Sequence, residues 1–272
     1  MSNPLNRQRP KIIAVANQKG GVGKTTTTIN VGAALVEAGL DVLIVDLDPQ
    51  GNASTGLGIE VEDRKLTTYD LLLDDIAPSD AIQETTVQDL FIVPTNTDLS
   101  SADIELIANE KRSFLLRDAL RHRDLDDFDF ILIDCPPSLN LLTVNAMIAA
   151  DSILVPLQSE FFALEGLSQL MMTVREVRQT ANKDLRIEGI VMTMSDVRNR
   201  LSQQVEQDAR DNLGELVFDT VIPRNVRVSE APSYALPVLA YDTMSKGASA
   251  YRDLAREIIA NNGLKEVEHG DI

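Results

Sequence analysis

The chain lacks the residues and runs that would point to metal clusters, membranes or secretion. Its 272 residues include one cysteine, Cys135, and two well-separated histidines, His122 and His269. A single cysteine excludes a disulfide framework and a cysteine-held iron–sulfur or zinc cluster within one chain. No apolar run approaches the 18 residues of a membrane span, and the polar first ten residues are not a signal peptide. We therefore expect a cytoplasmic protein.

An excess of basic residues is also absent. The chain has 42 acidic and 25 basic residues, a net charge of −17, which argues against a protein that coats DNA through general positive charge. The net charge does not speak against a local basic patch, because affinity for phosphate depends on where the bases lie. Apolar residues at 44% and charged residues at 25% are typical of a globular protein with a large core.

Short apolar runs alternate with helical patterns along the chain. The apolar runs are Ile12–Ala16, Val42–Val45, Leu90–Val93, Phe130–Ile133, Ser152–Pro156, Ile187–Met192 and Leu216–Ile222. The helical patterns are Thr25–Ala38, Ser101–Leu120, Leu141–Ala149, Ala163–Thr180 and Ser202–Leu213. Runs that are apolar on both faces and separated by helices indicate a mostly parallel sheet covered on both sides. The sequence predicts a doubly wound α/β fold.

The pattern is weakest in Gly51–Thr86, where glycine, aspartate and threonine interrupt short helical stretches. We expect this segment to be a surface excursion with one or two short helices. No long polar linker separates it from the rest of the chain. The prediction is therefore a single domain over 1–272, with a flexible N-terminus at 1–10 and an acidic tail at 263–272.

A glycine-rich segment links the first apolar run to the first helical pattern. It reads Asn17-Gln18-Lys19-Gly20-Gly21-Val22-Gly23-Lys24-Thr25-Thr26. Glycines let backbone N–H groups turn inward around phosphate oxygens, and the next helix offers its N-terminus. Lys24 is predicted to contact the β- and γ-phosphates and Thr25 to bind Mg²⁺. The usual motif requires glycine at position 18, whereas here Lys19 opens the deviant Walker A pattern K-G-G-x-G-K-T.

Five motifs make the sequence resemble the ParA/Soj-type partition ATPases. They are Lys19–Thr26, Asp46–Asn52, Asp134–Leu139, Ala163–Leu167 and Ile222–Pro232. The first motif specifies only the deviant Walker superfamily, and the last narrows it to the partition branch. The resemblance runs from about Lys11 to about Ile259. It implies a P-loop NTPase fold of the short form, without the N-terminal helix-turn-helix domain of long plasmid ParA proteins.

Three aspartates follow apolar runs at the edge where ligands of open α/β sheets gather. The resemblance implies that Asp48 positions the attacking water and that Asp46 supports the Mg²⁺ shell. It also makes Asp134 the Walker B aspartate, which holds Mg²⁺ through water. An aspartate after a strand is otherwise a common turn former or helix cap. Three of them downstream of a P-loop favour the chemical interpretation.

Lys19 is the residue that distinguishes this family. In the family this lysine reaches across a dimer interface to the partner's phosphates, where an extra cation stabilises the transition state. The resemblance therefore implies an ATP-dependent homodimer, with Lys19, Lys24 and Asp48 as catalytic residues. A solvated surface lysine is the alternative. The resemblance also places Pro223 and Asn225 near the adenine, although Asn225 could equally cap the backbone of its own loop.

The stretch from Arg175 to Arg227 is neutral, with nine basic and nine acidic residues, so the rest of the chain carries the net charge. The resemblance maps non-specific contacts with double-stranded DNA onto Arg198 and Arg227. Such contacts go to phosphates and weaken with salt. The alternative is that these arginines form surface ion pairs with neighbours such as Asp196 and Glu230.

The resemblance implies a slow ATPase that acts in chromosome or plasmid partition. Its Mg·ATP dimer would bind the nucleoid, and a ParB-type centromere-binding protein would stimulate hydrolysis and release the DNA. The alternative is a MinD-like membrane ATPase, which requires a basic amphipathic C-terminal helix. Here an apolar stripe predicts core packing instead, and anionic lipid would repel the acidic tail. The stripe consists of Tyr251, Leu254, Ala255, Ile258 and Ile259.

Two further functions fit the sequence less well. An iron–sulfur electron-transfer ATPase needs at least two ligating cysteines from each subunit, and Cys135 is alone. A nucleotide-binding scaffold that never hydrolyses ATP is disfavoured because Lys19, Asp48 and Asp134 are all present.

Overall fold

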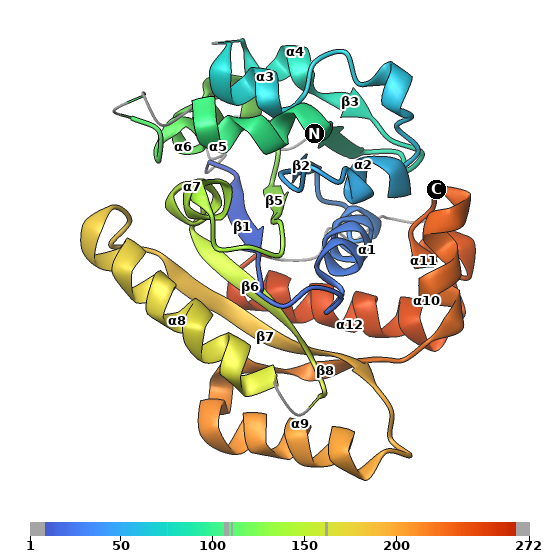
Figure 1. Cartoon of the computed structure of the whole chain (residues 1–272). Coiled ribbons are helices and arrows are strands. Elements are labelled where there is room, and N and C mark those ends of the chain that lie inside the picture. Colours follow the sequence, from blue (N-terminus) through green and yellow to red (C-terminus); the bar gives the residue numbers. More distant parts are fainter. Residues whose placement is uncertain (1–8, 75, 106–108, 110, 161–162, 265–272) are drawn as a thin grey trace.

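The computed structural model describes residues 9–74, 76–105, 109, 111–160 and 163–264. The predicted flexible N-terminus and acidic tail fall almost entirely outside these residues. The described strands form one sheet in the order β3-β4-β2-β5-β1-β6-β7-β8, parallel throughout except for β3 against β4 (Figure 1). Their bounds are β1 Lys11–Val15, β2 Val42–Asp46, β3 Gln83–Glu84, β4 Leu90–Val93, β5 Phe130–Asp134, β6 Ser152–Gln158, β7 Arg186–Ser195 and β8 Val217–Pro223.

Helices cover both faces of the sheet, so the predicted doubly wound fold is confirmed. The α-helices are α1 Lys24–Glu37, α2 Asn52–Gly56, α3 Thr68–Leu73, α4 Pro78–Ala81, α5 Ala102–Glu105, α6 Leu115–Leu120, α7 Leu141–Ala149, α8 Ala163–Thr180, α9 Arg200–Leu213, α10 Val226–Glu230, α11 Val238–Tyr241 and α12 Lys246–Asn261. One face packs against α1, α11 and α12, and the other against α3, α6, α7, α8 and α9.

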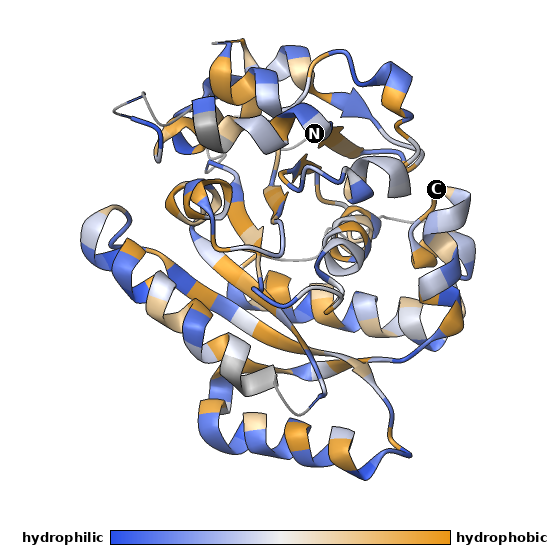
Figure 2. Ribbon diagram, viewed as in Figure 1, coloured by the Kyte–Doolittle hydropathy of each residue, from blue (hydrophilic) through white to orange (hydrophobic). Residues whose placement is uncertain are grey.

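Period-two alternation along each strand supplies both cores. In β1, Ile12 and Ala14 pack into one hydrophobic cluster, while Ile13 and Val15 pack into the other. Figure 2 shows the apolar residues concentrated on the strands and on the inner sides of the helices. The stripe on α12 behaves as predicted, because Tyr251 and its apolar neighbours on that helix are buried. No described helix is long and apolar enough to cross a membrane.

The helix predicted over 101–120 is interrupted. Among the described residues of this stretch, the structure has the short helices α5 and α6, with a turn at 111–114 before α6 begins. The side chain of Asn109 accepts a hydrogen bond from the backbone N–H of Lys111 at 2.8 Å. Such a local bond offers the backbone an alternative to helix, which the apolar periodicity of the sequence does not reveal.

The segment Gly51–Thr86 is more ordered and more buried than predicted. It contains α2, α3 and α4 together with the edge strand β3. Ser54 and Thr68 are fully buried, and Arg64 is 8% exposed. The Arg64 guanidinium is satisfied by three acceptors, the carbonyls of Ile59 and Thr95 and the Thr55 hydroxyl. Polar residues therefore fold inward here because they find partners, and the expectation of a surface excursion is wrong for this part.

The strand order brings the functional segments together at one edge. Strand β5 lies between β1 and β2, so the residues that follow these strands meet at their carboxyl ends. In the register, Asp134 is opposite Val15 on one side and Asp46 on the other. The P-loop and two of the predicted acids are thereby placed side by side, which is the usual ligand position in such sheets.

Candidate active site

The P-loop turns through two glycines in the left-handed conformation. Gly21 has φ 75°, and Gly23, the N-cap of α1, has φ 88°. Residues with a Cβ rarely adopt these angles, so glycine is needed at both positions. No side chain caps the start of α1. Its first N–H groups are therefore left for a ligand, and a helix N-terminus favours an anion.

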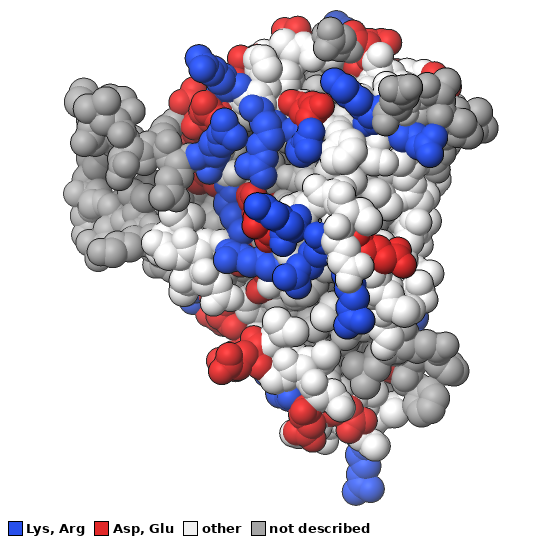
Figure 3. Space-filling view, turned by 90° about the vertical axis from the view of Figure 1, so that its left-hand side faces the viewer, with Lys and Arg blue, Asp and Glu red and all other residues white. Residues whose placement is uncertain are grey.

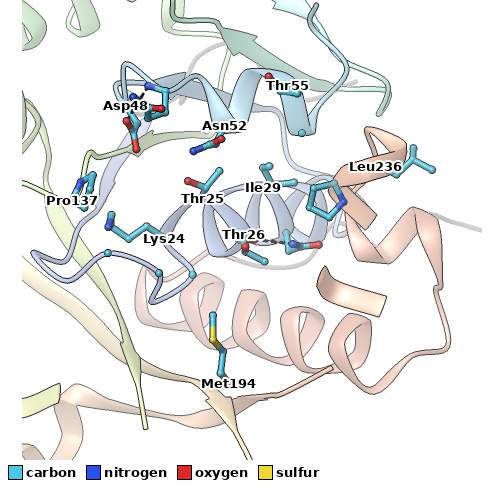
Figure 4. Close-up of a pocket in the computed structure, with 17 residues that line it drawn as sticks. Lys24, Thr25, Thr26, Ile29, Asp48, Asn52, Thr55, Pro137, Met194 and Leu236 are labelled. Atoms are coloured by element: carbon cyan, nitrogen blue, oxygen red, sulfur yellow. Dashed lines mark hydrogen bonds between the residues drawn. The ribbon is translucent and has the colours of Figure 1, made fainter. Parts of the chain in front are cut away.

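A cavity of about 500 Å³ lies in front of this loop. Figure 4 shows Lys24, Asp48 and Pro137 at one end of the cavity and Leu236 at the other, with Thr25 between them. The lining residues come from the P-loop and α1, the segment after β2, and three later segments. They are Gly20, Gly21, Gly23, Lys24, Thr25, Thr26, Ile29, Asn30, Asp48, Gln50, Asn52, Thr55, Gly56, Pro137, Met194, Pro232 and Leu236.

Lys24 supplies a buried cation at the phosphate end. The residue is 7% exposed, and its Nζ donates to the carbonyl of Lys19 at 3.2 Å. Burial lowers the pKa of this ammonium, and the nearby Asp134 carboxyl acts in the opposite direction. A partly desolvated lysine interacts strongly with an anion, because the water that would screen the charge is largely absent.

Asp134 has an oxygen that the protein leaves unpartnered. Its Oδ1 accepts a hydrogen bond from Thr28 Oγ1 at 3.1 Å, whereas Oδ2 is buried and has no partner among the described residues. Burial, together with the Asp46 carboxyl, raises the pKa of Asp134 to about 8. A buried carboxylate with a free oxygen close to Thr25 fits a magnesium hydration shell, since Mg²⁺ takes oxygen ligands and keeps several waters.

Both carboxylate oxygens of Asp46 accept hydrogen bonds from the segment that follows β2. Its Oδ2 accepts from the backbone N–H of Ser54 at 2.8 Å and from Ser54 Oγ at 2.7 Å, and its Oδ1 accepts from the N–H of Asp48 at 3.3 Å. Burial raises its pKa to about 6. These bonds make Asp46 a support that holds Asp48 and the start of α2 at the cavity.

Asp48 is 7% exposed and lines the cavity itself. Its Oδ1 accepts from the N–H of Gln50 at 3.1 Å, which orients the carboxylate within the loop after β2. The other carboxylate oxygen has no hydrogen bond among the interactions described for this side chain. Asp48 therefore presents an acceptor at the same end of the cavity as Lys24 (Figure 4).

Lys19 lies outside the cavity of its own chain. Its Nζ pairs with Glu160 Oε2 at 2.8 Å, with the two side chains 35% and 50% exposed. Its backbone N–H donates to Asn17 Oδ1, and Asn17 in turn donates to the carbonyl of Pro156. The ammonium therefore sits at the surface beside the P-loop, where a second molecule could meet it.

Pro223 and Asn225 line a second, smaller cavity of about 100 Å³, together with Gly23, Thr26 and Met194. Asn225 Oδ1 accepts from the N–H of Arg227 at 2.8 Å and so caps α10. The capping role weighed for Asn225 is thus present in the structure. Asn225 also shares this cavity with Gly23 and Thr26 of the P-loop region, and its contact with the adenine stays a prediction.

The two arginines predicted to contact DNA both form ion pairs. Arg198 pairs with Asp196 at 3.0 Å, and its side chain is 86% exposed. Arg227 pairs with Glu230 at 3.0 Å and with Asp242 at 3.2 Å. Exposed pairs of this kind contribute little, so the arginines can exchange an acid for a phosphate at small cost.

Sequence reasoning missed several residues that line the cavity, among them Gln50, Thr55, Met194 and Leu236. Gln50 lies within the motif Asp46–Asn52, so the family resemblance could have indicated that it lines the site. Met194 has φ 52° at the end of β7, and its Cε lies 3.7 Å from where a Cβ on Gly23 would stand. No local pattern indicates this, because the contact joins segments 171 residues apart.

Comparisons with known proteins agree with this geometry. A family model described as an AAA domain matches residues 10–187. The chromosome partitioning protein ParA of Caulobacter vibrioides is 54% identical over 260 residues, covering 95% of this chain and 96% of that protein. The sporulation initiation inhibitor protein Soj of Bacillus subtilis is 51% identical over 251 residues, covering 92% and 99%.

A solved structure from Mycobacterium smegmatis shares both fold and sequence with the chain. It is described as cobyrinic acid a,c-diamide synthase with a bound ATP analogue and magnesium. Its TM-score is 0.79 at 40% identity, and the match covers 91% of this chain and 93% of that one.

Proposed function

The chain belongs to the ParA/Soj family of chromosome-partitioning ATPases, and from this premise we propose a cycle of ATP-gated DNA binding. The protein is an ATPase that uses ATP with Mg²⁺. In the proposed cycle, Mg·ATP draws two copies together and the dimer binds double-stranded DNA without sequence preference. A ParB-type centromere-binding protein then stimulates hydrolysis, and the dimer releases the DNA.

The observation that carries the proposal is the cavity in which the P-loop, Lys24 and Asp48 converge, with Asp134 buried next to α1, where it accepts a hydrogen bond from Thr28. The P-loop N–H groups and Lys24 would hold the phosphates, and Thr25 with Asp134 would hold magnesium, which neutralises phosphate charge. Asp48 would orient the attacking water, because its carboxylate faces the phosphate end of the cavity. Asp46 would keep Asp48 in place through the bonds described above.

The position of Lys19 supports a nucleotide sandwich. A lysine that stands outside its own cavity and pairs with an exposed acid is free to reach a partner's phosphates once Glu160 is released. Two such lysines would add one cation to each active site only in the dimer. Hydrolysis would therefore depend on dimerisation, as an arginine finger makes it depend on a second protein.

DNA binding is assigned to Arg198, in the turn after β7, and to Arg227, in the first turn of α10 after β8. Both side chains are at the surface, and both would exchange an ion-paired acid for a phosphate. Contacts of this type carry little sequence information and weaken with salt. They suit an ATPase that moves over the nucleoid as a whole rather than to one site.

The test is binding of a labelled non-specific duplex with ATP, with ADP and without nucleotide, over a salt series. We expect tight binding with ATP that weakens with salt, and tighter retention for Asp48→Ala, which would bind ATP without hydrolysing it. Arg198→Glu or Arg227→Glu should remove ATP-dependent binding and leave dimerisation intact, whereas the control Arg256→Glu should bind as wild type. A dimer that forms with ATP and shows no ATP-dependent affinity for DNA would refute the proposal.

The MinD-like membrane alternative loses its structural basis within the described residues. The apolar stripe of α12, which would have to lie on lipid, is buried against α1 and the sheet. The acidic tail invoked against lipid binding lies outside the described residues. Vesicle flotation of the ATP-bound protein is the direct comparison, and we expect no association.

A further inference from the structure

On one face of the protein, exposed charges of both signs lie close together. Figure 3 shows lysine and arginine side chains gathered across the middle of this face, with acidic side chains between and around them. Interactions between such exposed charges are weak, because water screens them. A polar contact has more effect where both groups are buried, and α1 makes such a contact with the end of β5.

Thr28 lies on the face of α1 that carries the phosphate-binding side chains. It follows Lys24 by four residues and Thr25 by three, and residues at these spacings share one face of a helix. Thr28 is completely buried, and its hydroxyl donates to Oδ1 of Asp134 at 3.1 Å. Burial raises the pKa of Asp134, whereas the Thr25 and Thr28 hydroxyls act in the opposite direction. Two successive turns of α1 therefore favour the ionised form of this carboxyl.

The backbone of Asp134 is fixed by the strands on both sides. The N–H of Leu47 donates to the carbonyl of Asp134 at 3.0 Å, and the N–H of Cys135 donates to the carbonyl of Val15 at 3.3 Å. The two oxygens of the carboxylate differ, because Oδ1 is held by Thr28 whereas Oδ2 is buried without a partner among the described residues. The hydrogen bond from Thr28 therefore decides which oxygen remains for a further ligand.

The Thr28 hydroxyl has one hydrogen and two acceptors within reach. Besides Asp134 Oδ1, the carbonyl of Lys24 lies 3.0 Å from Thr28 Oγ1. That carbonyl is in the first turn of α1, where the regular helix pattern already supplies it with the backbone N–H of Thr28. An ionised carboxylate is also the stronger acceptor. We therefore expect the hydrogen to point to Asp134 whenever that carboxylate is ionised.

We propose that Thr28 is a positioning residue for magnesium, because it holds Oδ1 of Asp134 and so leaves Oδ2 for the hydration shell of the metal. Thr28 is not among the residues that line the nucleotide cavity, so it acts through Asp134. Partners of this kind orient the groups that hold a metal, and their loss lowers metal affinity by roughly 10- to 100-fold. The inference rests on the proposed function in taking Asp134 as the residue that holds magnesium.

The test is the affinity for ADP, measured by calorimetry over a range of Mg²⁺ concentrations and in EDTA. The variant Thr28→Val removes the hydroxyl and keeps a side chain of similar size. The matched control is Thr27→Val, because Thr27 is also completely buried on α1 and its hydroxyl has no hydrogen-bond partner among the described residues. The Mg²⁺ concentration that gives half of the magnesium-dependent gain in affinity should rise roughly tenfold or more in Thr28→Val. It should stay at the wild-type value in the control, and ADP affinity in EDTA should be the same in all three proteins.

Two further variants separate the Thr28 hydroxyl from the packing of its methyl group. Thr28→Ser keeps the donor and should need no more Mg²⁺ than wild type, whereas Thr28→Ala should behave as Thr28→Val. This pair also supplies the test if the valine variant does not fold. A serine variant that needs as much Mg²⁺ as the alanine variant would show that Thr28 acts through packing, and the proposal would be wrong.

Asp134→Asn distinguishes failure of this inference from failure of the proposed function. If Asp134→Asn raises the Mg²⁺ requirement and Thr28→Val does not exceed its control, only the role of Thr28 is wrong. If Asp134→Asn leaves the requirement unchanged, the magnesium role of Asp134 is wrong, and the role of Thr28 falls with it. The double variant Asp134→Asn, Thr28→Val should need no more Mg²⁺ than Asp134→Asn alone, because Thr28 acts through Asp134. Additive effects in the double variant would contradict the proposal.

Discussion

The two edges of the sheet differ in whether their charged side chains are buried or exposed. At the carboxyl edge, Asp46 and Asp134 are completely buried on neighbouring strands, and burial raises the pKa of each. At the amino edge, Arg178 and Lys183 remain at the surface in an open groove. Buried charges are costly and are kept for chemistry, whereas exposed charges cost little and suit reversible contacts. Changes at the first edge should therefore alter nucleotide binding, and changes at the second should not.

The largest effect is expected for Lys24→Gln. The substitution removes the buried ammonium from the phosphate end of the cavity, and a hydrogen bond to a charged group is worth roughly 1.5–3 kcal/mol. ATP affinity measured by calorimetry should fall about 100-fold. Lys65→Gln, an exposed control, should bind ATP as wild type. Unchanged affinity of Lys24→Gln would mean that the cavity does not hold the phosphates as described.

Arg64→Ala tests the buried hydrogen bonds that link the segment after β2 to Thr95, which follows β4 near the carboxyl edge of the sheet. The guanidinium donates to the carbonyls of Ile59 and Thr95 and to Thr55, and alanine would leave these buried acceptors unpaired. The free energy of unfolding in urea should fall by about 3 kcal/mol. ATP affinity should fall as well, because Thr55 lines the cavity. Stability within about 0.5 kcal/mol of wild type would show that the segment needs no such anchor.

Asp134→Asn tests how much the burial of an ionisable carboxyl at position 134 lowers the free energy of unfolding. The pKa of Asp134 is about 8 in the folded protein and near 4 in the unfolded chain. Between these values the unfolded chain has lost its proton while the folded chain keeps it, so wild-type stability falls as pH rises from 4 to 8. Asparagine cannot ionise. In EDTA without nucleotide, the variant should be more stable than wild type at pH 8, and this difference should disappear as the pH falls towards 4.

The matching measurement for Asp134→Asn is its response to Mg²⁺ and ATP. Wild type should gain thermal stability from Mg·ATP, and the variant should gain much less, because it lacks the carboxylate that would hold the metal. A variant that is destabilised at pH 8 without nucleotide would contradict the claim that burial of this charge is costly.

Asn182→Ala is the counterpart at the amino edge. Three carbonyls at the end of α7 would lose their donor, and the free energy of unfolding should fall by about 1–2 kcal/mol. ATP affinity should stay at the wild-type value, since this loop is at the far edge of the sheet. A clear loss of ATP affinity at unchanged stability would contradict the expectation that changes at the amino edge leave nucleotide binding unaltered.

The smallest change in stability is expected for Glu160→Gln, which removes the exposed partner of Lys19. Stability should change by less than about 0.5 kcal/mol, because exposed ion pairs contribute little. With Lys19 released, the ATP-dependent dimer should form at lower protein concentration, as measured by light scattering after gel filtration. A weaker dimer would show that Glu160 assists Lys19 rather than restraining it.

Much of the catalytic edge was predictable because its signals are local. The run from Lys19 to Thr26 combines glycines, lysine and threonine in a spacing that only a phosphate loop requires. The apolar runs predicted seven of the eight strands in the described part of the chain, with bounds close to those observed. Strand β3, two residues long and antiparallel, carries no pattern of its own and forms only because β4 offers a partner edge.

The sequence by itself determined the fold class, the phosphate loop and the acids that follow the strands, since each depends on neighbouring residues along the chain. Only the tertiary structure decided which charges are buried and which are open. In the folded protein, Arg64 is buried and donates to three acceptors, and Lys19 forms an ion pair with Glu160. One carboxylate oxygen of Asp134 has no hydrogen-bond partner among the described residues. The tertiary structure also placed Arg121 and Arg178, which are 57 residues apart in the chain, in the lining of one groove. The physical reason is that burial and pairing depend on segments that meet in space, and no spacing along the chain encodes those meetings.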